Sequence, residues 1–185
     1  MSETADAACG GNRWGVAFLD TFRYLDQLGR LAKSGVEVVF HNTLDASDYG
    51  LLDEKTLAPK PNYWGALLWR KLMGTTVLES GVPIREGLQL YAHSLRGHPG
   101  GVVLLAVNNS RTQSTTIDLP MPADRYTLTA KNPEDDQVQL NGQELKLGAN
   151  DELPSRQDKR MRAGRVELPP TSITFLAIPD AGNGS

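Results

Sequence analysis

Two stretches in the first half of the sequence carry the hydrophobic spacing of helices. Between Val16 and Lys33, apolar side chains recur at three- and four-residue steps, at Phe18, Phe22, Leu25, Leu28 and Ala32. This spacing predicts a helix with one buried face, which ends before Gly35. A second stripe over 63–73, followed by Gly74, predicts another helix of the same kind.

Between these two helices lies a short run with the composition of a strand. Val36–Phe40 is rich in β-branched and aromatic residues, and a polar loop over 41–49 follows it. Pro59 and Pro61 then interrupt the chain ahead of the second helix. The order helix, strand, loop and helix predicts an α/β arrangement up to about Gly74.

Beyond Gly74 the pattern changes to short strands separated by turn residues. The expected strands cover 75–78, 88–93, 102–107, 114–119, 125–130 and 172–178. Asn141-Gly142, between two short apolar runs, predicts a tight hairpin because both turn positions tolerate positive φ. The charged stretch 148–163 is expected to be an exposed loop. Strands of this number and spacing predict an antiparallel β-sandwich.

These patterns divide the chain into three predicted parts. Residues 1–74 are the α/β part, residues 75–180 form an antiparallel β-sandwich domain, and residues 181–185 form a flexible tail. The predicted fold class is therefore α+β, with the two kinds of element in separate regions of the sequence.

The composition of the chain limits the kinds of molecule that it is expected to bind. With 39% hydrophobic and 22% charged residues, the chain is typical of a folded globular protein. Its net charge is −3 and its longest basic run is Lys159-Arg160, so we expect no nucleic acid partner. The single cysteine, Cys9, excludes an internal disulfide and a cysteine-based metal site.

The sequence also carries no pattern that would place it in a membrane. No apolar run reaches 18 residues, so we expect no membrane span. The start at Met1 has neither the basic stretch nor the apolar run of a signal peptide. A signal peptide upstream of this chain would place it outside the cell or in the periplasm, and the compartment is otherwise open.

Four motifs, in this order, carry a family resemblance. They are Glu3-Thr-Ala-Asp with Gly10-Gly11, the run 20–29 (DTFRYLDQLG), the run 49–54 (YGLLDE) and the run 61–74 (PNYWGALLWRKLMG). Together they resemble glycoside hydrolase family 79, which includes animal and plant heparanases and bacterial β-glucuronidases. The resemblance implies an eight-fold (β/α) barrel with an attached β-sandwich. Residues 1–74 would then be the remnant of the last β/α units of a (β/α)8 barrel, and an N-terminal barrel chain would supply the others.

Glu3 is the candidate catalytic residue. Retaining glycosidases need two carboxyl groups roughly 5 Å apart, one a nucleophile and one an acid and then a base. By the resemblance, Glu3 matches the family's nucleophile, at the C-terminal end of a barrel strand. The family's acid/base, in an Asn-Glu pair further upstream, has no counterpart here. In this chain alone, Glu3 is equally well interpreted as a solvated terminal residue. The chemistry implies no metal and no cofactor.

The candidate substrate-binding residues are Gly10, Gly11, His41 and Tyr49. The two glycines resemble a loop whose backbone amides approach the substrate carboxylate, which missing side chains permit. Tyr49 matches an aromatic that contacts the uronic acid, and its alternative role is packing at the barrel rim. His41 ends the predicted strand, where the barrel rule directs it toward the site; the alternative is a hydrogen-bonded structural histidine.

Several further polar and aromatic residues are interpreted as structural. Four carboxylates are expected to be solvated or to cap elements: Asp20, Asp26, Asp53 and Glu54. Trp64 and Trp69 could be platforms for sugar rings, but their helical spacing with neighbouring leucines favours packing.

Three functions follow from these interpretations. The first is the C-terminal portion of a retaining glycoside hydrolase that cleaves β-glucuronides or glucuronic-acid-containing glycans and is inactive without its N-terminal barrel. The second is a non-catalytic β-sandwich that binds glycans or stabilises a partner. The third is a truncated product without function, whose helices expose apolar faces.

Overall fold

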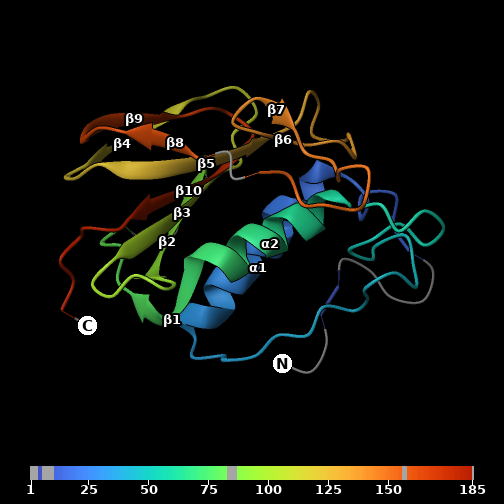
Figure 1. The fold of residues 1–185 in the computed structure, drawn as a ribbon, viewed down its shortest axis with the longest axis horizontal. Coiled ribbons are helices and arrows are strands. Elements are labelled where there is room, and N and C mark those ends of the chain that lie inside the picture. The colour runs from blue at the N-terminus through green and yellow to red at the C-terminus, as the bar shows by residue number, and fades with distance from the viewer. Residues whose placement is uncertain (1–3, 6–10, 83–86, 156–157, 185) are drawn as a thin grey trace. The chain divides into compact units, whose positions relative to one another are not determined.

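The computed structural model describes residues 4–5, 11–82, 87–155 and 158–184 (Figure 1). The chain forms two compact units. The first comprises Met1–Leu67 with Ala130–Arg156, and the second comprises Leu68–Thr129 with Gln157–Ser185. These units do not coincide with the predicted limit at residue 74, since residues 130–156 belong to the first. The division into a barrel part (1–74), a sandwich domain (75–180) and a tail stays a prediction.

Both predicted helices are present in the structure. They are α1 (Phe18–Lys33) and α2 (Pro61–Leu72), which lie side by side (Figure 1). A Cβ added at Gly65 of α2 would lie 2.9 Å from the Thr21 methyl group, so glycine permits the close approach of the two helices. α2 ends at Leu72, close to the predicted end, but Gly74 lies within strand β1 and does not itself terminate the helix.

The predicted strand at Val36–Phe40 is reduced to a single bridge. Thr4 pairs with His41 in parallel orientation. The Thr4 amide donates to the Phe40 carbonyl at 2.9 Å, and the Asn42 amide donates to the Thr4 carbonyl at 2.8 Å. Val38 is 55% exposed and Phe40 is 63% exposed. A parallel strand needs neighbours on both sides to be buried, and the described residues supply this short pairing alone.

The second unit is built around an antiparallel sheet. Its strands follow the order β1-β2-β3-β10-β5, and β8 also pairs with β5. β10 lies between β3 and β5, where Phe175 faces Leu105 on one side and Tyr126 on the other. The bounds of these strands are β1 (Met73–Leu78), β2 (Leu88–Leu95), β3 (Val102–Asn108), β5 (Ala123–Thr129), β8 (Lys159–Met161) and β10 (Ser172–Ile178).

A separate pair of strands covers one face of this sheet. β4 (Thr115–Leu119) pairs antiparallel with β9 (Gly164–Leu168), and the pair is drawn above the main sheet in Figure 1. Side chains from both sheets form one buried apolar cluster: Leu90, Ala106, Leu119, Ala123, Val166, Leu168, Leu176 and Ile178. The chain is therefore mixed α/β with a mostly antiparallel sheet, and the second unit has a core of its own.

The stretch 148–163 corrects one expectation. The sequence predicts an exposed loop over its whole length, whereas β8 lies within it and β9 follows directly. β8 is polar, so pairing with β5 rather than its own hydrophobic pattern makes it a strand. The predicted hairpin is confirmed: β6 (Gln139–Leu140) and β7 (Gln143–Glu144) flank Asn141 and Gly142, whose φ angles are 51° and 85°.

Candidate functional site

Two loops of the first unit meet at the candidate binding residues. Gly11 has a φ of 74°, and a Cβ at this position would collide with the carboxylate of Asp48. A Cβ at Gly15 would lie 2.8 Å from the Cβ of Tyr49. The loop over 11–15 therefore packs tightly against residues 48 and 49 and requires glycine there. Glu3 and Gly10, the other predicted site residues, lie outside the described residues.

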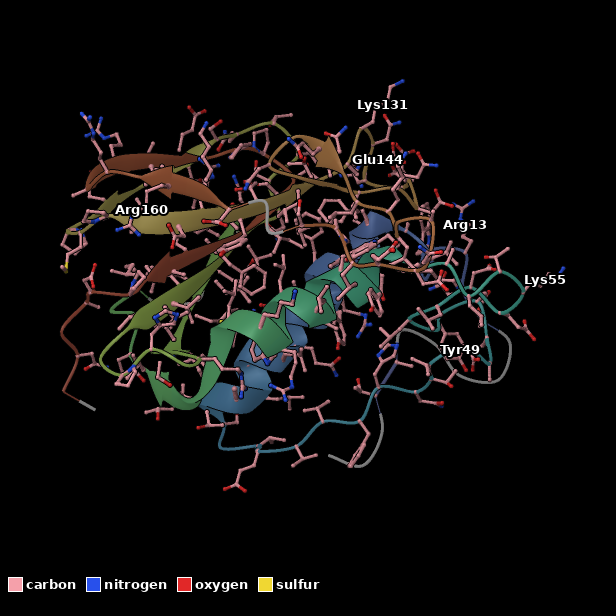
Figure 2. All side chains as sticks on the ribbon, in the orientation of Figure 1. Arg13, Tyr49, Lys55, Lys131, Glu144 and Arg160 are labelled. Atoms are coloured by element: carbon pink, nitrogen blue, oxygen red, sulfur yellow. The ribbon has the colours of Figure 1, made fainter. Side chains whose placement is uncertain are left out.

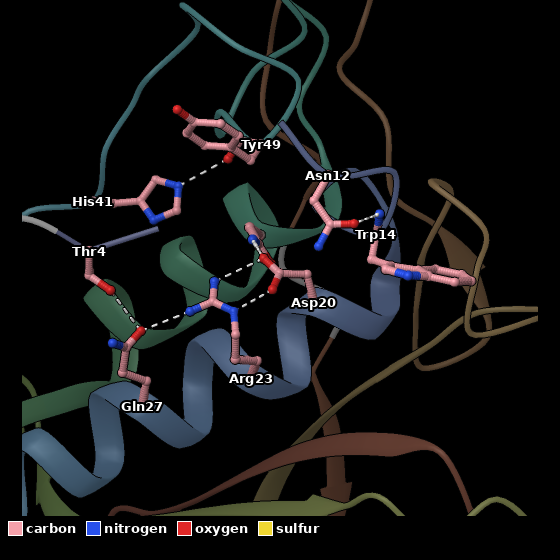
Figure 3. Close-up of polar contacts among 9 residues, drawn as sticks. Thr4, Asn12, Trp14, Asp20, Arg23, Gln27, His41 and Tyr49 are labelled. Atoms are coloured by element: carbon pink, nitrogen blue, oxygen red, sulfur yellow. Dashed lines mark hydrogen bonds and ion pairs between the residues drawn. The ribbon is translucent and has the colours of Figure 1, made fainter. Parts of the chain in front are cut away.

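His41 contacts the same loop (Figure 3). Its Nε2 donates to the backbone carbonyl of Tyr49 at 3.2 Å, and its ring meets that of Tyr24 edge to face at 5.2 Å between centroids. The Nδ1 atom is buried and has no hydrogen-bond partner among the described residues. Burial lowers the pKa of His41, although the bond to the Tyr49 carbonyl acts in the opposite direction. His41 is therefore a neutral group near pH 7.

Tyr49 itself is buried. The residue is 7% exposed, so a ligand could reach little of its surface in this arrangement. Through its carbonyl it brings His41 to the loop that Gly11 and Gly15 contact (Figures 2 and 3). The structure thus gathers three of the predicted binding residues, Gly11, His41 and Tyr49, around one loop, and their role toward a substrate stays a prediction.

Lys60 anchors this loop, a role that no sequence pattern predicts. The residue is 8% exposed, and its ammonium donates to the carbonyls of Asp48 at 2.6 Å and Ser47 at 3.4 Å. Its backbone amide donates to the Leu51 carbonyl at 3.0 Å. A lysine between two prolines has no periodicity that marks it, so only the folded loop shows its partners.

Replacing Lys60 with methionine is expected to loosen the loop that carries Tyr49. The stem of the side chain is kept, but two carbonyls lose a charged donor, which costs about 1–2 kcal/mol. The amides of Gly50 and Leu51 should then exchange hydrogen faster. Lys55→Met is the matched control, because Lys55 is exposed and points away from the loop (Figure 2). Equal exchange in both variants would contradict the anchoring role.

A chain of polar contacts lies beside His41 (Figure 3). Asn62 of α2 donates to Asp20 Oδ2 at 2.6 Å, and Arg23 donates to both Asp20 oxygens. Arg23 Nη1 also donates to Gln27 Oε1 at 2.9 Å, and the Thr4 hydroxyl donates to the same oxygen at 2.8 Å. Asp20 is 4% exposed, so its interpretation as a solvated or capping carboxylate is wrong. Its partner Asn62, 42 residues away, could not be assigned from sequence.

Asp26, Asp53 and both tryptophans have structural partners, and Glu54 is exposed. Asp26 pairs with Arg30 on the surface of α1 at 2.8 Å. Asp53 accepts bonds from Thr56 and from the Lys55 amide, which lower its pKa. Trp64 is 3% exposed, and Trp69 meets His93 edge to face at 5.3 Å, a second-unit contact. The contacts of Asp53 and of the two tryptophans agree with the expected roles in capping and in packing.

A groove of about 740 Å³ lies in the first unit, and its lining includes none of Gly11, His41 and Tyr49. It runs between residues 52–64 and residues 136–153. Tyr63 and Trp64 line it together with the charged side chains of Asp136, Glu144, Lys146 and Asp151. Within the described part of the chain, no group of three His, Cys, Asp or Glu residues could hold a metal ion. No described helix is long and apolar enough to cross a membrane.

The depressed pKa of His41 gives the first unit a pH-dependent stability. The folded pKa lies below the unfolded value of about 6.5, so the unfolded chain binds the proton first as the pH falls. The contribution is complete above pH 6.5 and is lost as the pH falls through the folded pKa. We expect His41→Gln to reduce the difference in unfolding free energy between pH 7.5 and 5. An NMR titration that placed the His41 pKa above 6.5 would contradict this sign.

Comparison with known proteins identifies relatives along almost the whole chain. No family model matches the sequence. Mouse heparanase is 35% identical over 98% of the chain and 37% of its own length. Baicalin-beta-D-glucuronidase of Scutellaria baicalensis is 30% identical over 88% of the chain and 32% of its length. Human inactive heparanase-2 is 29% identical over 93% of the chain and 33% of its length.

Solved structures of glycoside hydrolases share the fold. An arabinofuranosidase superimposes with a TM-score of 0.67 at 12% identity, over 96% of this chain and 42% of that structure. The GH51 alpha-L-arabinofuranosidase of Thermotoga petrophila RKU-1 gives 0.66 at 13% identity over the same shares. Identities this low show the fold alone.

The sequence relatives agree with the resemblance found in the motifs. They cover 88 to 98% of the chain, while the chain spans only 32 to 37% of their length. Their names, heparanase and β-glucuronidase, match the family that the four motifs resemble. Over most of its length the chain is therefore homologous to the heparanases and β-glucuronidases of glycoside hydrolase family 79.

Proposed function

We propose that this chain is the C-terminal part of a retaining glycoside hydrolase that cleaves β-glucuronide linkages, with Glu3 as its nucleophile. The observation that carries the proposal is the 35% identity to mouse heparanase across 98% of the chain. A second relative is named for hydrolysis of a β-D-glucuronide. The substrate class is therefore a β-glucuronide or a glucuronic-acid-containing glycan.

The chemistry needs two carboxyl groups on opposite sides of the glycosidic bond. The Glu3 carboxylate would attack the anomeric carbon while a carboxylic acid protonates the departing oxygen, leaving a glycosyl ester on Glu3. The second group, now a carboxylate, would take a proton from water, which attacks the anomeric carbon and frees Glu3. That second group would come from an Asn-Glu pair elsewhere in the barrel, so this chain alone would be inactive.

The geometry of the first unit supports the barrel part of the proposal. Thr4 and His41 pair in parallel, and helix α1 lies between them in sequence, which is the connection of a β/α unit. Val38 and Phe40 are exposed on the second extended segment, where further barrel strands and helices would cover them. We propose that residues 1–74 form the last β/α units and that an N-terminal barrel chain completes them.

The candidate substrate contacts keep their proposed roles within this scheme. Gly10 and Gly11 would offer backbone amides to the substrate carboxylate, and His41 and Tyr49 would line the same side. His41 would act as a neutral polar group, because burial lowers its pKa. The Asp48 carboxylate lies against Gly11, so a bound uronate would require Asp48 to turn outward.

Hydrolysis of an aryl β-glucuronide tests the proposal. The chain is assayed alone and after co-expression with an upstream barrel portion that contains an Asn-Glu pair. We expect no release of the aryl group by the chain alone and measurable release by the combined protein. Hydrolysis by the isolated chain, or none by a combined protein that folds and associates, would contradict the proposal.

A second candidate is a non-catalytic module that binds glycans or stabilises a partner. The observation that favours it is the 29% identity to a relative named as inactive, over 93% of the chain. Calorimetric titration of the chain with uronic-acid oligosaccharides should then give heat of binding without hydrolysis. A titration without heat would count against the glycan-binding form of this alternative.

A further inference from the structure

Thr4 is held from three directions by described residues. Its amide and carbonyl bond to Phe40 and Asn42 at 2.9 and 2.8 Å. Its hydroxyl donates to Gln27 Oε1 of α1 at 2.8 Å, and the residue is 8% exposed. The backbone bonds fix Thr4 against the neighbouring extended segment, whereas the hydroxyl bond fixes it against the helix. Gln27 thus determines how this segment sits on α1.

The oxygen of Gln27 is itself held in place (Figure 3). Arg23, one turn earlier on α1, donates to it at 2.9 Å and is bound in turn to Asp20. Asp20 also accepts a bond from Asn62 at the start of α2. The contacts therefore run without a break from α2 through α1 to Thr4, and each bond restricts the next.

Such a network is not needed simply to pack α1. An apolar side chain at position 27 could cover the same surface, while buried polar groups cost free energy unless they are paired. What the paired groups supply is a fixed distance and direction between the helix and Thr4. That is the property that a catalytic group on the adjoining residue requires, because displacement by 1 Å lowers rates sharply.

We propose that Gln27 is a positioning residue for the hydrolysis described above, acting through Thr4 on the proposed nucleophile Glu3, which immediately precedes it in the chain. The inference rests on the proposed function, since only that function gives Glu3 its role. Gln27 touches no reacting atom in this scheme. Arg23 orients the Gln27 oxygen, and the Thr4 hydroxyl transmits the position.

Hydrogen exchange tests the positioning directly, without requiring activity. Gln27→Met keeps the length of the side chain and removes the acceptor, so the Thr4 and Asn42 amides should exchange about tenfold faster. Gln27→Glu retains an acceptor for both Thr4 and Arg23 and should restore slow exchange. Asp26→Asn is the matched control, since it removes a surface pair on the same helix. The Leu105 amide in β3 reports any global loss of stability.

Unchanged exchange at Thr4 and Asn42 in Gln27→Met, or equal acceleration at Leu105, would overturn the proposal. In the combined protein that hydrolyses an aryl β-glucuronide, Gln27→Met should lower kcat about tenfold or more with KM changed less than about twofold, and Gln27→Glu should recover it. A higher KM in Gln27→Met, with kcat unchanged, would also overturn the proposal. If the wild-type protein shows no hydrolysis, the proposed function fails, whereas the exchange result still decides whether Gln27 positions Thr4.

Discussion

Replacing Glu3 with glutamine is expected to lower kcat for aryl β-glucuronide hydrolysis by at least about a thousandfold in the combined protein. The amide keeps the size of the side chain but cannot attack the anomeric carbon, so the glycosyl ester does not form. Binding of substrate should change little, because shape and hydrogen-bonding capacity are nearly kept. The measurement is the steady-state rate of aryl release, with Glu54→Gln as an exposed control.

A small anion can distinguish a lost nucleophile from a damaged fold. In Glu3→Gly, added azide has room to attack the anomeric carbon from the side that Glu3 vacates. The acid/base carboxyl still protonates the departing oxygen, so the product is an α-glucuronosyl azide with inverted configuration. Hydrolysis that is indifferent to Glu3→Gln would show that the nucleophile assignment is wrong.

Replacing Asp20 with alanine is expected to destabilise the first unit by about 3 kcal/mol. The Asp20 side chain is 2% exposed, and its loss leaves the Arg23 guanidinium and the Asn62 amide without their shared acceptor. Arg23 is 33% exposed, so water can replace part of the contact, which places the loss at the lower end of the range for buried pairs. Urea unfolding, followed by exchange of the α1 amides, measures the effect.

Asp26 on the same helix provides the comparison for Asp20. Its pair with Arg30 lies at the surface, with the two side chains 26% and 50% exposed. Alanine at position 26 should therefore cost only about 0.5 kcal/mol or less. Similar losses for the two variants would show that the buried network contributes no more than a surface ion pair.

The elements that the sequence predicted correctly are those with a strong local signal. The stripe from Phe18 onward has helical periodicity because one face of α1 is buried, and Asn141-Gly142 forms a turn that few other pairs tolerate. β8 could not be predicted, because it is polar and exists by pairing with β5. The strand expected at Val36–Phe40 has the right composition, but a parallel strand depends on neighbours that local composition does not describe.

In the candidate site, too, the features with a local sequence signal could be predicted, and those that depend on distant residues could not. Glycine at position 11 was predicted from a motif, and the structure shows the close approach of Asp48 that requires it. The bonds of His41 and Lys60 to backbone carbonyls leave no trace in side-chain patterns, so their partners could not be predicted. Asp20 looked like a surface carboxylate because its partner Asn62 is distant in sequence.

The path of the chain limits how the molecule can be dissected. The polypeptide passes from one compact unit to the other after Leu67, after Thr129 and after Arg156. A gene cut once therefore yields neither unit as one uninterrupted polypeptide. Isolating the second unit requires an artificial linker between Thr129 and Gln157, and isolating the first requires one between Leu67 and Ala130. Fragments made by truncation at residue 74 would carry residues 130–156 away from the unit in which they pack.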